Sequence, residues 1–210
     1  MAFHRIVRAH FEASVARSED LAAGPPEIAF VGRSNVGKSS LLNALCSQAT
    51  LARVSRTPGR TQRVNVFHAE LDDGRALRLV DLPGFGYAKL SHAQRDEMAP
   101  MVAAFVENRF SIGWLKAVVL LHDLRRDPDD DAIGFAAHIR NVQGKVELVA
   151  TKADQVPKTH RGAMLDALQK AYGLRWPPVA VSTLDGSGLE DVRHLVLRAC
   201  FPKPAKKPRT

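Results

Sequence analysis

The sequence has few cysteines and no long apolar run. These two shortages argue against a disulfide-rich or zinc-binding protein and against a membrane protein. Its two cysteines, Cys46 and Cys200, lie far apart and outside any CxxC pattern or Cys/His cluster. Buried, reduced thiols are therefore favoured over a disulfide framework or a structural zinc site. No stretch is apolar for long enough to form a signal-peptide core or a membrane span. We expect a cytoplasmic, monomeric protein with no membrane partner.

The chain is also short of acidic residues. It carries 30 lysines and arginines against 22 aspartates and glutamates, for a net charge of +8 and a pI near 9.9. A basic balance favours contact with a polyanion, although a solvated basic face has the same composition. No RRM or KH signature is present. The basic residues available to neutralise RNA phosphates are Arg5, Arg8, Arg53, Arg56, Arg60, Arg63, Lys203, Lys206, Lys207 and Arg209.

Short apolar segments alternate with amphipathic ones, and no internal repeat is present. Strands are predicted at residues 27–31, 64–71, 75–80, 116–122, 146–150 and 179–181, and helices at 37–47, 91–109, 129–141, 159–172 and 189–200. The second and third strands form a hairpin around Asp72-Asp73-Gly74. The pattern predicts an α/β fold with a mostly parallel six-stranded sheet, one antiparallel strand and helices on both faces. We expect residues 25–201 to form this domain, residues 1–24 to pack on it as an extension, and residues 202–210 to be a basic disordered tail.

Residues 32–39 match the phosphate-loop pattern G-x-x-x-x-G-K-S/T, between a predicted strand and a predicted helix. Gly32 and Gly37 allow a tight turn in which successive N–H groups point at phosphate oxygens, and the helix adds its dipole. Lys38 supplies a charge to the β- and γ-phosphates, and the Ser39 hydroxyl is a Mg²⁺ ligand. The predicted nucleotide contacts of this loop are Gly32, Arg33, Ser34, Asn35, Val36, Gly37, Lys38, Ser39 and Ser40.

A phosphate loop alone does not distinguish ATP from GTP, but a segment at the carboxyl edge of the predicted sheet does. This segment follows the strand at 146–150 and consists of Thr151, Lys152, Ala153 and Asp154. The Asp154 carboxylate can accept from N1–H and the 2-amino group of guanine, whereas adenine would leave it unpaired. The aliphatic stem of Lys152 can cover the base plane.

The last predicted strand leads into a second segment that can contact the base. Its backbone and hydroxyl groups can meet the guanine carbonyl oxygen, or they can form ordinary turn chemistry. The residues concerned are Val181, Ser182 and Thr183.

Two further segments suit the γ-phosphate and Mg²⁺. Asp81 ends a predicted strand and is placed to hold Mg²⁺ as a Walker-B acid does. The Gly84 N–H can meet the γ-phosphate, and the segment that follows, to residue 91, is predicted to be a switch loop. In the loop before the second strand, either Thr57 or Thr61 can complete the Mg²⁺ shell. The nucleotide contacts predicted after the third strand are Asp81, Leu82, Pro83 and Gly84.

Together these motifs resemble a translation-factor-class GTPase, and more closely the EngB family of bacterial GTPases. The segments that carry the resemblance are PEIAFV at 26–31, GRSNVGKSSL at 32–41, TPGRTQ at 57–62 and DLPGFGYAK at 81–89. The resemblance extends from about residue 6 to residue 201. It implies a three-layer, Ras-like P-loop GTPase fold. It also implies assistance in assembling the large ribosomal subunit, with rRNA contact, and a link to normal cell division and septation.

The resemblance implies roles for individual residues. Thr61 becomes the switch I ligand of Mg²⁺, beside Ser39 and Asp81. In related GTPases an asparagine matching Asn35 helps to bind K⁺, although a hydrogen bond within the loop is an equal explanation. The switch I residues expected at the nucleotide are Gly59, Arg60, Thr61 and Gln62, and those expected to act in hydrolysis are Lys38, Thr61, Gly84 and Asn35.

The sequence departs from the Ras-like pattern at Phe85, which stands where those enzymes carry a water-positioning glutamine. A phenyl ring cannot orient water by hydrogen bonding, so we predict slow intrinsic hydrolysis of GTP to GDP and phosphate. Two alternatives are a nucleotide-binding scaffold with little turnover and a P-loop ATPase or kinase, which Asp154 argues against. His122 lies in no catalytic or metal cluster and is expected to be a packed or partly exposed histidine.

Overall fold

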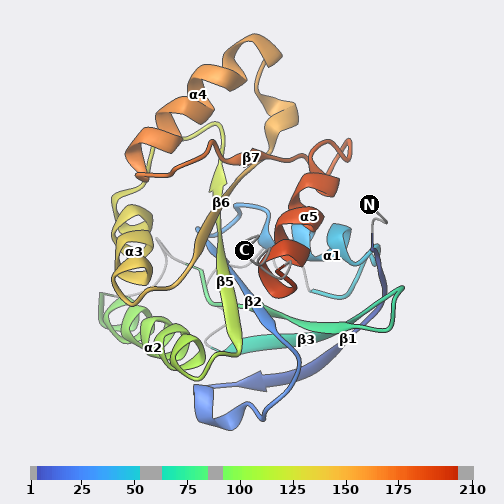
Figure 1. Cartoon of the computed structure of the whole chain (residues 1–210). Coiled ribbons are helices and arrows are strands. Elements are labelled where there is room, and N and C mark those ends of the chain that lie inside the picture. Colours follow the sequence, from blue (N-terminus) through green and yellow to red (C-terminus); the bar gives the residue numbers. More distant parts are fainter. Residues whose placement is uncertain (1–3, 53–62, 85–91, 203–210) are drawn as a thin grey trace, which may run out of the picture.

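The computed structural model describes residues 4–52, 63–84 and 92–202. Within them, one sheet joins seven strands in the order β1-β3-β4-β2-β5-β6-β7 (Figure 1). The strands are β1 (Ile6–Val15), β2 (Glu27–Gly32), β3 (Val64–Leu71), β4 (Ala76–Asp81), β5 (Leu115–Asp123), β6 (Val146–Thr151) and β7 (Val179–Ala180). The helices are α1 (Lys38–Leu45), α2 (His92–Ser111), α3 (Asp130–Asn141), α4 (Lys158–Ala171) and α5 (Leu189–Cys200), with 3₁₀ turns η1 (Ser18–Asp20) and η2 (Ala153–Gln155). Over these described ranges, no helix is both long and apolar enough to cross a bilayer.

The predicted count of six strands is wrong by one, because residues 6–15 form the edge strand β1. β1 runs antiparallel to β3, and β3 runs antiparallel to β4, so β3 is the one strand of reversed direction, as predicted. In β1, Ala9 and Val15 are buried, whereas Arg8, His10 and Glu12 are exposed. Charged side chains are typical of edge strands, where they discourage pairing with another chain. Apolar and polar residues alternate along the strand from Val7 to Val15, and this alternation is the signal that could have found it in the sequence.

Side chains alternate across the sheet and build one core on each face. In β2, Ala29 and Val31 belong to the core under α2, α3 and α4, whereas Ile28 and Phe30 belong to the core under α1 and α5 (Figure 1). The predicted α/β fold with helices on both faces is therefore confirmed. Every residue of β2 is buried, because a central strand covered on both faces has no solvent side.

Both thiols lie in the core beneath α1 and α5. Cys46 and Cys200 are buried and unbonded, as predicted. Burial raises the pKa of each thiol to about 12. Since the thiolate is the reactive form of cysteine, neither side chain is set up as a nucleophile or metal ligand.

A buried ionic network anchors the amino end of β2. The Glu27 side chain is fully buried, and Arg109 of α2 donates to both of its oxygens, with 2.9 Å from Nε to Oε2. Arg78 of β4 approaches Glu27 Oε1 at 3.4 Å and donates from Nε to Glu12 of β1 at 2.9 Å. Arg109 also donates to the Leu21 carbonyl oxygen at 3.1 Å. The network therefore ties β1, β2, β4 and α2 together at the end of the sheet opposite the phosphate-loop motif.

The strand order places the predicted motifs at one edge of the sheet. β2, β4, β5, β6 and β7 are parallel, so their carboxyl ends meet on the same side. β2 lies between β4 and β5, and the chain continues from it to β3 on one side before it crosses to β5 on the other. Such a switch point is where open α/β sheets bind their ligands. The residues that follow β2 are those of the predicted phosphate loop.

Candidate nucleotide-binding site

The phosphate loop, residues 32–39, bends sharply between β2 and α1. Gly32 passes so close to β5 that an added Cβ would lie 2.7 Å from the Leu121 carbonyl oxygen, which no side chain can tolerate. Gly37 caps α1 with a φ of 104°, in the left-handed region that favours glycine. The helix therefore begins directly at Lys38, with its free N–H groups and positive dipole end at the loop. This backbone is an anion cradle.

Two charged side chains of the predicted site meet beside the cradle. The Lys38 ammonium donates to the Asp81 carboxylate at the end of β4 and to the Leu82 carbonyl oxygen. Asp81 is buried, and it is in register with Phe30 of β2, two residues before the loop begins. The structure thus joins the lysine predicted to bind phosphate and the predicted Mg²⁺ ligand, which are far apart in the sequence.

The predicted base-reading segment, residues 151–154, contacts the phosphate loop directly. Lys152, with a left-handed φ of 59°, donates from Nζ to the Asn35 carbonyl oxygen at 2.7 Å. The buried Thr151 hydroxyl donates to the Val36 carbonyl oxygen at 2.6 Å. The two loops are therefore held at a fixed spacing by contacts to carbonyl groups, which do not depend on the phosphate loop's side chains.

Asp154 lies half-buried in turn η2, beside the loop that follows β7. Ala153 N–H donates to the Val181 carbonyl oxygen at 3.1 Å, which ties the two base-reading segments together. Ser182 is fully buried, and its hydroxyl oxygen accepts from the N–H groups of Leu184 and Asp185 at 3.1 and 3.2 Å. This hydroxyl closes its own turn, and the N–H groups of Val181 and Ser182 donate to the Ala150 and Ser187 carbonyl oxygens at 2.8 and 2.9 Å.

Asp123 is a site residue that motif reasoning did not select. Its buried carboxylate, at the end of β5, accepts from Lys152 Nζ at 2.9 Å and from Arg125 Nε and Nη2 at 2.8 and 2.6 Å. Burial opposes ionisation, but the hydrogen bonds from Arg125 and Lys152 outweigh it and hold the pKa of the Asp123 carboxyl well below its usual range. Asp123 therefore positions the lysine that joins the two loops. Its place opposite Thr151 in the β5–β6 register is the signal that could have found it.

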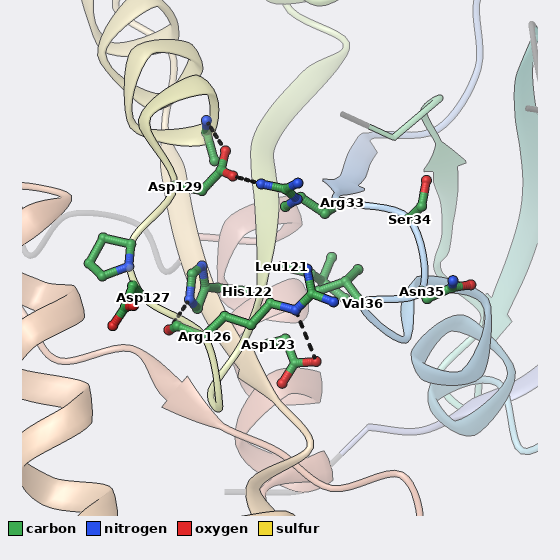
Figure 2. Close-up of a pocket in the computed structure, with 12 residues that line it drawn as sticks. Arg33, Ser34, Asn35, Val36, Leu121, His122, Asp123, Arg126, Asp127 and Asp129 are labelled. Atoms are coloured by element: carbon green, nitrogen blue, oxygen red, sulfur yellow. Dashed lines mark hydrogen bonds and ion pairs between the residues drawn. The ribbon is translucent and has the colours of Figure 1, made fainter. Parts of the chain in front are cut away.

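A pocket of about 130 Å³ lies between the phosphate loop and the segment that leads from β5 to α3 (Figure 2). The two sides meet where Arg33 pairs with Asp129. His122 is buried, and its two ring nitrogens lie 3.2 Å from the Tyr172 hydroxyl and 3.0 Å from the Arg126 carbonyl oxygen. The expectation that His122 is a packed histidine is therefore confirmed.

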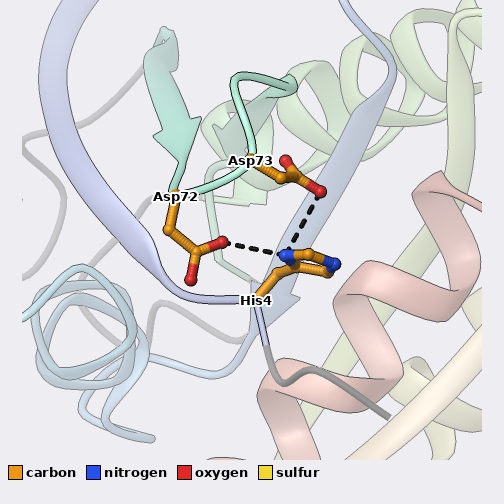
Figure 3. A group of neighbouring side chains, drawn as sticks. All are labelled: His4, Asp72 and Asp73. Carbon is orange, nitrogen blue, oxygen red and sulfur yellow. Dashed lines mark hydrogen bonds and ion pairs between the residues drawn. The ribbon is translucent and has the colours of Figure 1, made fainter.

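A second polar cluster lies away from these loops, at the turn between β3 and β4 (Figure 3). His4 Nδ1 lies 2.9 Å from Asp72 and 3.2 Å from Asp73. Asp73 also pairs with Arg75 at 2.6 Å, and Asp72 accepts from the Arg5 N–H at 3.2 Å. Both carboxylates thus have protein partners, and the cluster fastens the start of β1 to the turn.

Comparison with known proteins places this geometry in a family. Residues 27–152 match the family model described as a 50S ribosome-binding GTPase. The chain is 39% identical to a probable GTP-binding protein EngB of Anaeromyxobacter sp. (strain Fw109-5), over 97% of this chain and 96% of the relative. A second relative of the same name, from Anaeromyxobacter dehalogenans (strain 2CP-C), is 41% identical over 89% of this chain and 88% of its own length. The chain belongs to the EngB family.

Solved structures agree on the fold of this EngB family member. A crystal structure of a probable GTP-binding protein engB superposes with a TM-score of 0.67 at 19% identity, over 84% of this chain and all of that one. The Era protein of Aquifex aeolicus bound to GDP and AlF₄⁻ gives a TM-score of 0.69 at 21% identity, over 89% of this chain and 60% of Era. The predicted P-loop GTPase fold is confirmed.

Within the described residues of this EngB family member, most of the predicted site residues lie at one edge of the sheet, at the carboxyl ends of its parallel strands. The phosphate loop, Asp81 to Gly84, Thr151 to Asp154 and the segment after β7 all follow parallel strands or open α1. Other predicted residues lie outside the described ranges, namely Thr57, Gly59, Arg60, Thr61, Gln62, Phe85 and the basic residues Arg53, Arg56, Lys203, Lys206, Lys207 and Arg209.

Replacing Asp123 with asparagine is expected to destabilise the fold at neutral pH and much less in acid. The folded-state pKa lies below the ordinary 3.8. The stabilisation is therefore complete above that ordinary value and is lost as pH falls through the folded-state value. We expect the free energy of unfolding to drop by about 1.5–3 kcal/mol at pH 7, as for hydrogen bonds to charged groups. Urea unfolding at pH 7 and in acid measures the difference.

The matched control is Asp127→Asn, which removes an exposed carboxylate of the same segment. It should change the free energy of unfolding little at either pH, as surface substitutions do. An Asp123→Asn loss that is equal at both pH values would contradict the assigned role of the carboxylate charge.

Proposed function

We propose that the protein is a guanine-nucleotide switch that binds GTP or GDP with Mg²⁺ and hydrolyses GTP to GDP and phosphate. The observation that carries this proposal is the direct joining of the two loops through Lys152 and Thr151. It holds an anion cradle and a half-buried carboxylate, Asp154, in one preorganised site. When a ligand binds to a preorganised site, less free energy is spent on ordering the loops and side chains of the site.

Guanine selectivity is assigned to Asp154. A carboxylate accepts from both N1–H and the 2-amino group of guanine, and adenine offers neither donor at these positions. The Lys152 stem runs from this segment to Asn35 of the phosphate loop, which suits it to cover the base. Of the segment from Val181 to Thr183, the Thr183 N–H is assigned to the guanine carbonyl oxygen, because the N–H groups of Val181 and Ser182 already donate to protein carbonyl oxygens.

The donors near the cradle fit Mg²⁺. Ser39 at the start of α1 and Asp81 at the end of β4 offer hydroxyl and carboxylate oxygens, the ligands that this hard cation prefers. A cation already contacts Asp81 in the structure, since the Lys38 ammonium donates to it. We assign Mg²⁺ to Ser39 and Asp81, with Thr61 as the third protein ligand. When bound, Mg²⁺ neutralises charge on the phosphates.

Hydrolysis is proposed to be slow. Lys38 and the Gly84 N–H stabilise charge on the γ-phosphate, but Phe85 cannot orient the attacking water. Asn35 is exposed and has a left-handed φ of 62°, and its side chain is proposed as a K⁺ ligand that supplies the missing positive charge. Single-turnover hydrolysis in KCl and in NaCl tests this assignment. Faster turnover in KCl supports it, and equal rates exclude it.

We further propose that the GTP-bound form binds the large ribosomal subunit or its precursor in the cytoplasm, as a monomer. The description of the matching family model names 50S binding, and the net charge of +8 suits contact with rRNA. A structure of Era, whose fold is similar, contains nucleotides 1506–1542 of 16S rRNA. By family resemblance, this activity supports normal cell division and septation. In this assignment residues 25–201 are the GTPase domain, and the flanking residues are an extension and a basic tail.

Sedimentation with purified ribosomal subunits tests the switch. Association with the large subunit is expected in a non-hydrolysable GTP analogue, with much less in GDP and with the small subunit. Raising the salt concentration should weaken the association. Binding that is equal in the two nucleotides would leave a nucleotide-binding scaffold as the better description. Preference for ATP over GTP in a competition assay would exclude the guanine switch altogether.

A further inference from the structure

The phosphate loop contains a second cation, Arg33, whose partner lies outside the loop. The Arg33 guanidinium extends across the pocket and pairs with one carboxylate oxygen of Asp129, Oδ2 (Figure 2). The other oxygen, Oδ1, accepts from the Ala132 N–H at 2.9 Å and caps α3. One carboxylate therefore fastens the phosphate loop to the first turn of α3. The Asp129 side chain is 9% exposed, so this pairing is well protected from solvent on the acidic side.

The segment between β5 and α3, which contains Asp129, is held in place by buried contacts with the core. Tyr172, at the end of α4, is buried, and its hydroxyl lies 3.2 Å from His122 Nδ1. His122 Nε2 lies 3.0 Å from the Arg126 carbonyl oxygen, in the middle of the segment. Burial raises the pKa of Tyr172 to about 12, so the hydroxyl stays protonated. The contacts that hold this segment thus come from β5 and from the end of α4, which both pack in the core.

The Arg33–Asp129 contact has two effects on a bound nucleotide, and they have opposite signs. As a charge, Asp129 repels the phosphates, so its removal alone would strengthen binding. As a fastening point, Asp129 holds Arg33 and with it the backbone of the anion cradle. Its removal would then let the loop leave its binding geometry more often, and binding would weaken. The direction of the measured change therefore separates the two effects.

We propose that Asp129 is a positioning residue of the nucleotide site, which acts through Arg33 to hold the phosphate loop in its anion-binding conformation and so prolongs nucleotide residence. This inference rests on the proposed function, because it requires that the loop bind guanine nucleotide. Asp129 touches no phosphate in this assignment. It belongs to the site because its two oxygens join the loop to α3.

The test is the dissociation rate of a fluorescent GDP analogue from the full-length Asp129→Asn variant. Asparagine is as good an N-cap as aspartate, so the start of α3 is retained while the charge is removed. We expect release to accelerate by roughly 2- to 30-fold, the range for mutations that couple to a binding site without contacting the ligand. Thermal unfolding of the nucleotide-free protein is measured in parallel, since a merely structural role would lower the midpoint without changing the release rate.

Asp130→Asn is the matched control, because it removes the same charge from the next residue, which is exposed. It should not accelerate release. Arg33→Gln should accelerate release, and the Arg33→Gln/Asp129→Asn double variant should be no faster than Arg33→Gln alone, because both changes break one contact.

Unchanged or slower release from Asp129→Asn, with tight binding by the wild type, would overturn the positioning role and leave the proposed function intact. A wild-type protein that does not bind the GDP analogue would overturn both.

Discussion

Replacing Glu27 with alanine is expected to lower the free energy of unfolding by about 3–5 kcal/mol, the usual result of removing one partner from a buried ion pair. The Glu27 side chain is fully buried, Arg109 is 2% exposed, and Arg109 donates to both carboxylate oxygens. Without the carboxylate, the Arg109 charge stays buried, and among the described residues it keeps the hydrogen bond to the Leu21 carbonyl oxygen. Most small domains are stable by only about 5–15 kcal/mol, so this loss is a large share of the total.

Urea unfolding followed by circular dichroism measures the effect, and Glu190→Ala is the matched control. Glu190 is an exposed glutamate that pairs with Arg193 one turn along α5, and its removal should cost less than about 1 kcal/mol. A second comparison isolates the charge. Glu27→Met/Arg109→Met should be more stable than Glu27→Met, because an apolar pair replaces an ion pair better than an unpaired charge does. If the double variant is the less stable of the two, the network is not held by this ion pair.

The network also has a consequence for function. Glu27 begins β2, and Gly32 ends the same strand at the phosphate loop. Arg109 lies near the end of α2, whose first residues follow the predicted switch segment. The network therefore fixes the far ends of the strand that leads into the phosphate loop and of the helix that follows the predicted switch segment.

The parts of the fold that the sequence predicted are those with strong local patterns. Central strands such as β2 and β5 are buried on both faces, so they appear as continuous apolar runs. The helix ends were within a few residues, and the start of α3 was predicted from its acidic first turn, which suits the positive end of the helix dipole. The phosphate loop was found because its chemistry requires fixed residue types at fixed spacing.

Two of the three parts that were missed depend on tertiary contacts. β1 is the exception, because apolar and polar residues alternate in it from Val7 to Val15, and that pattern indicates a strand. Asp123 belongs to no motif. Its role follows from the pairing of β5 with β6, which sets its carboxylate beside Lys152. The Arg33–Asp129 pair joins residues 96 positions apart in the chain, and no local pattern predicts such a contact.

Replacing Asp154 with asparagine is expected to abolish guanine selectivity and to favour xanthine nucleotides. Asparagine offers one acceptor and an N–H₂ donor, so it loses the acceptor for one guanine N–H and presents a donor in its place. The loss of one hydrogen bond to a charged group corresponds to about 1.5–3 kcal/mol. GDP affinity should therefore fall by at least about 10–10²-fold. XDP, which carries a carbonyl oxygen where guanine carries the 2-amino group, should bind the variant more tightly than it binds the wild type.

Competition between GDP and XDP against a fluorescent nucleotide measures both changes, and Asp166→Asn provides the matched control. Asp166 lies exposed on α4, away from both base-reading segments, so the same substitution there should leave both affinities unchanged. The turn η2 is tied to the loop after β7 by the backbone bond from Ala153 to Val181, which does not involve the Asp154 side chain. The variant should therefore keep its fold, and the phosphate loop should still bind the XDP phosphates. A variant that loses GDP affinity without gaining XDP affinity would show that Asp154 supports the loop and does not read the base.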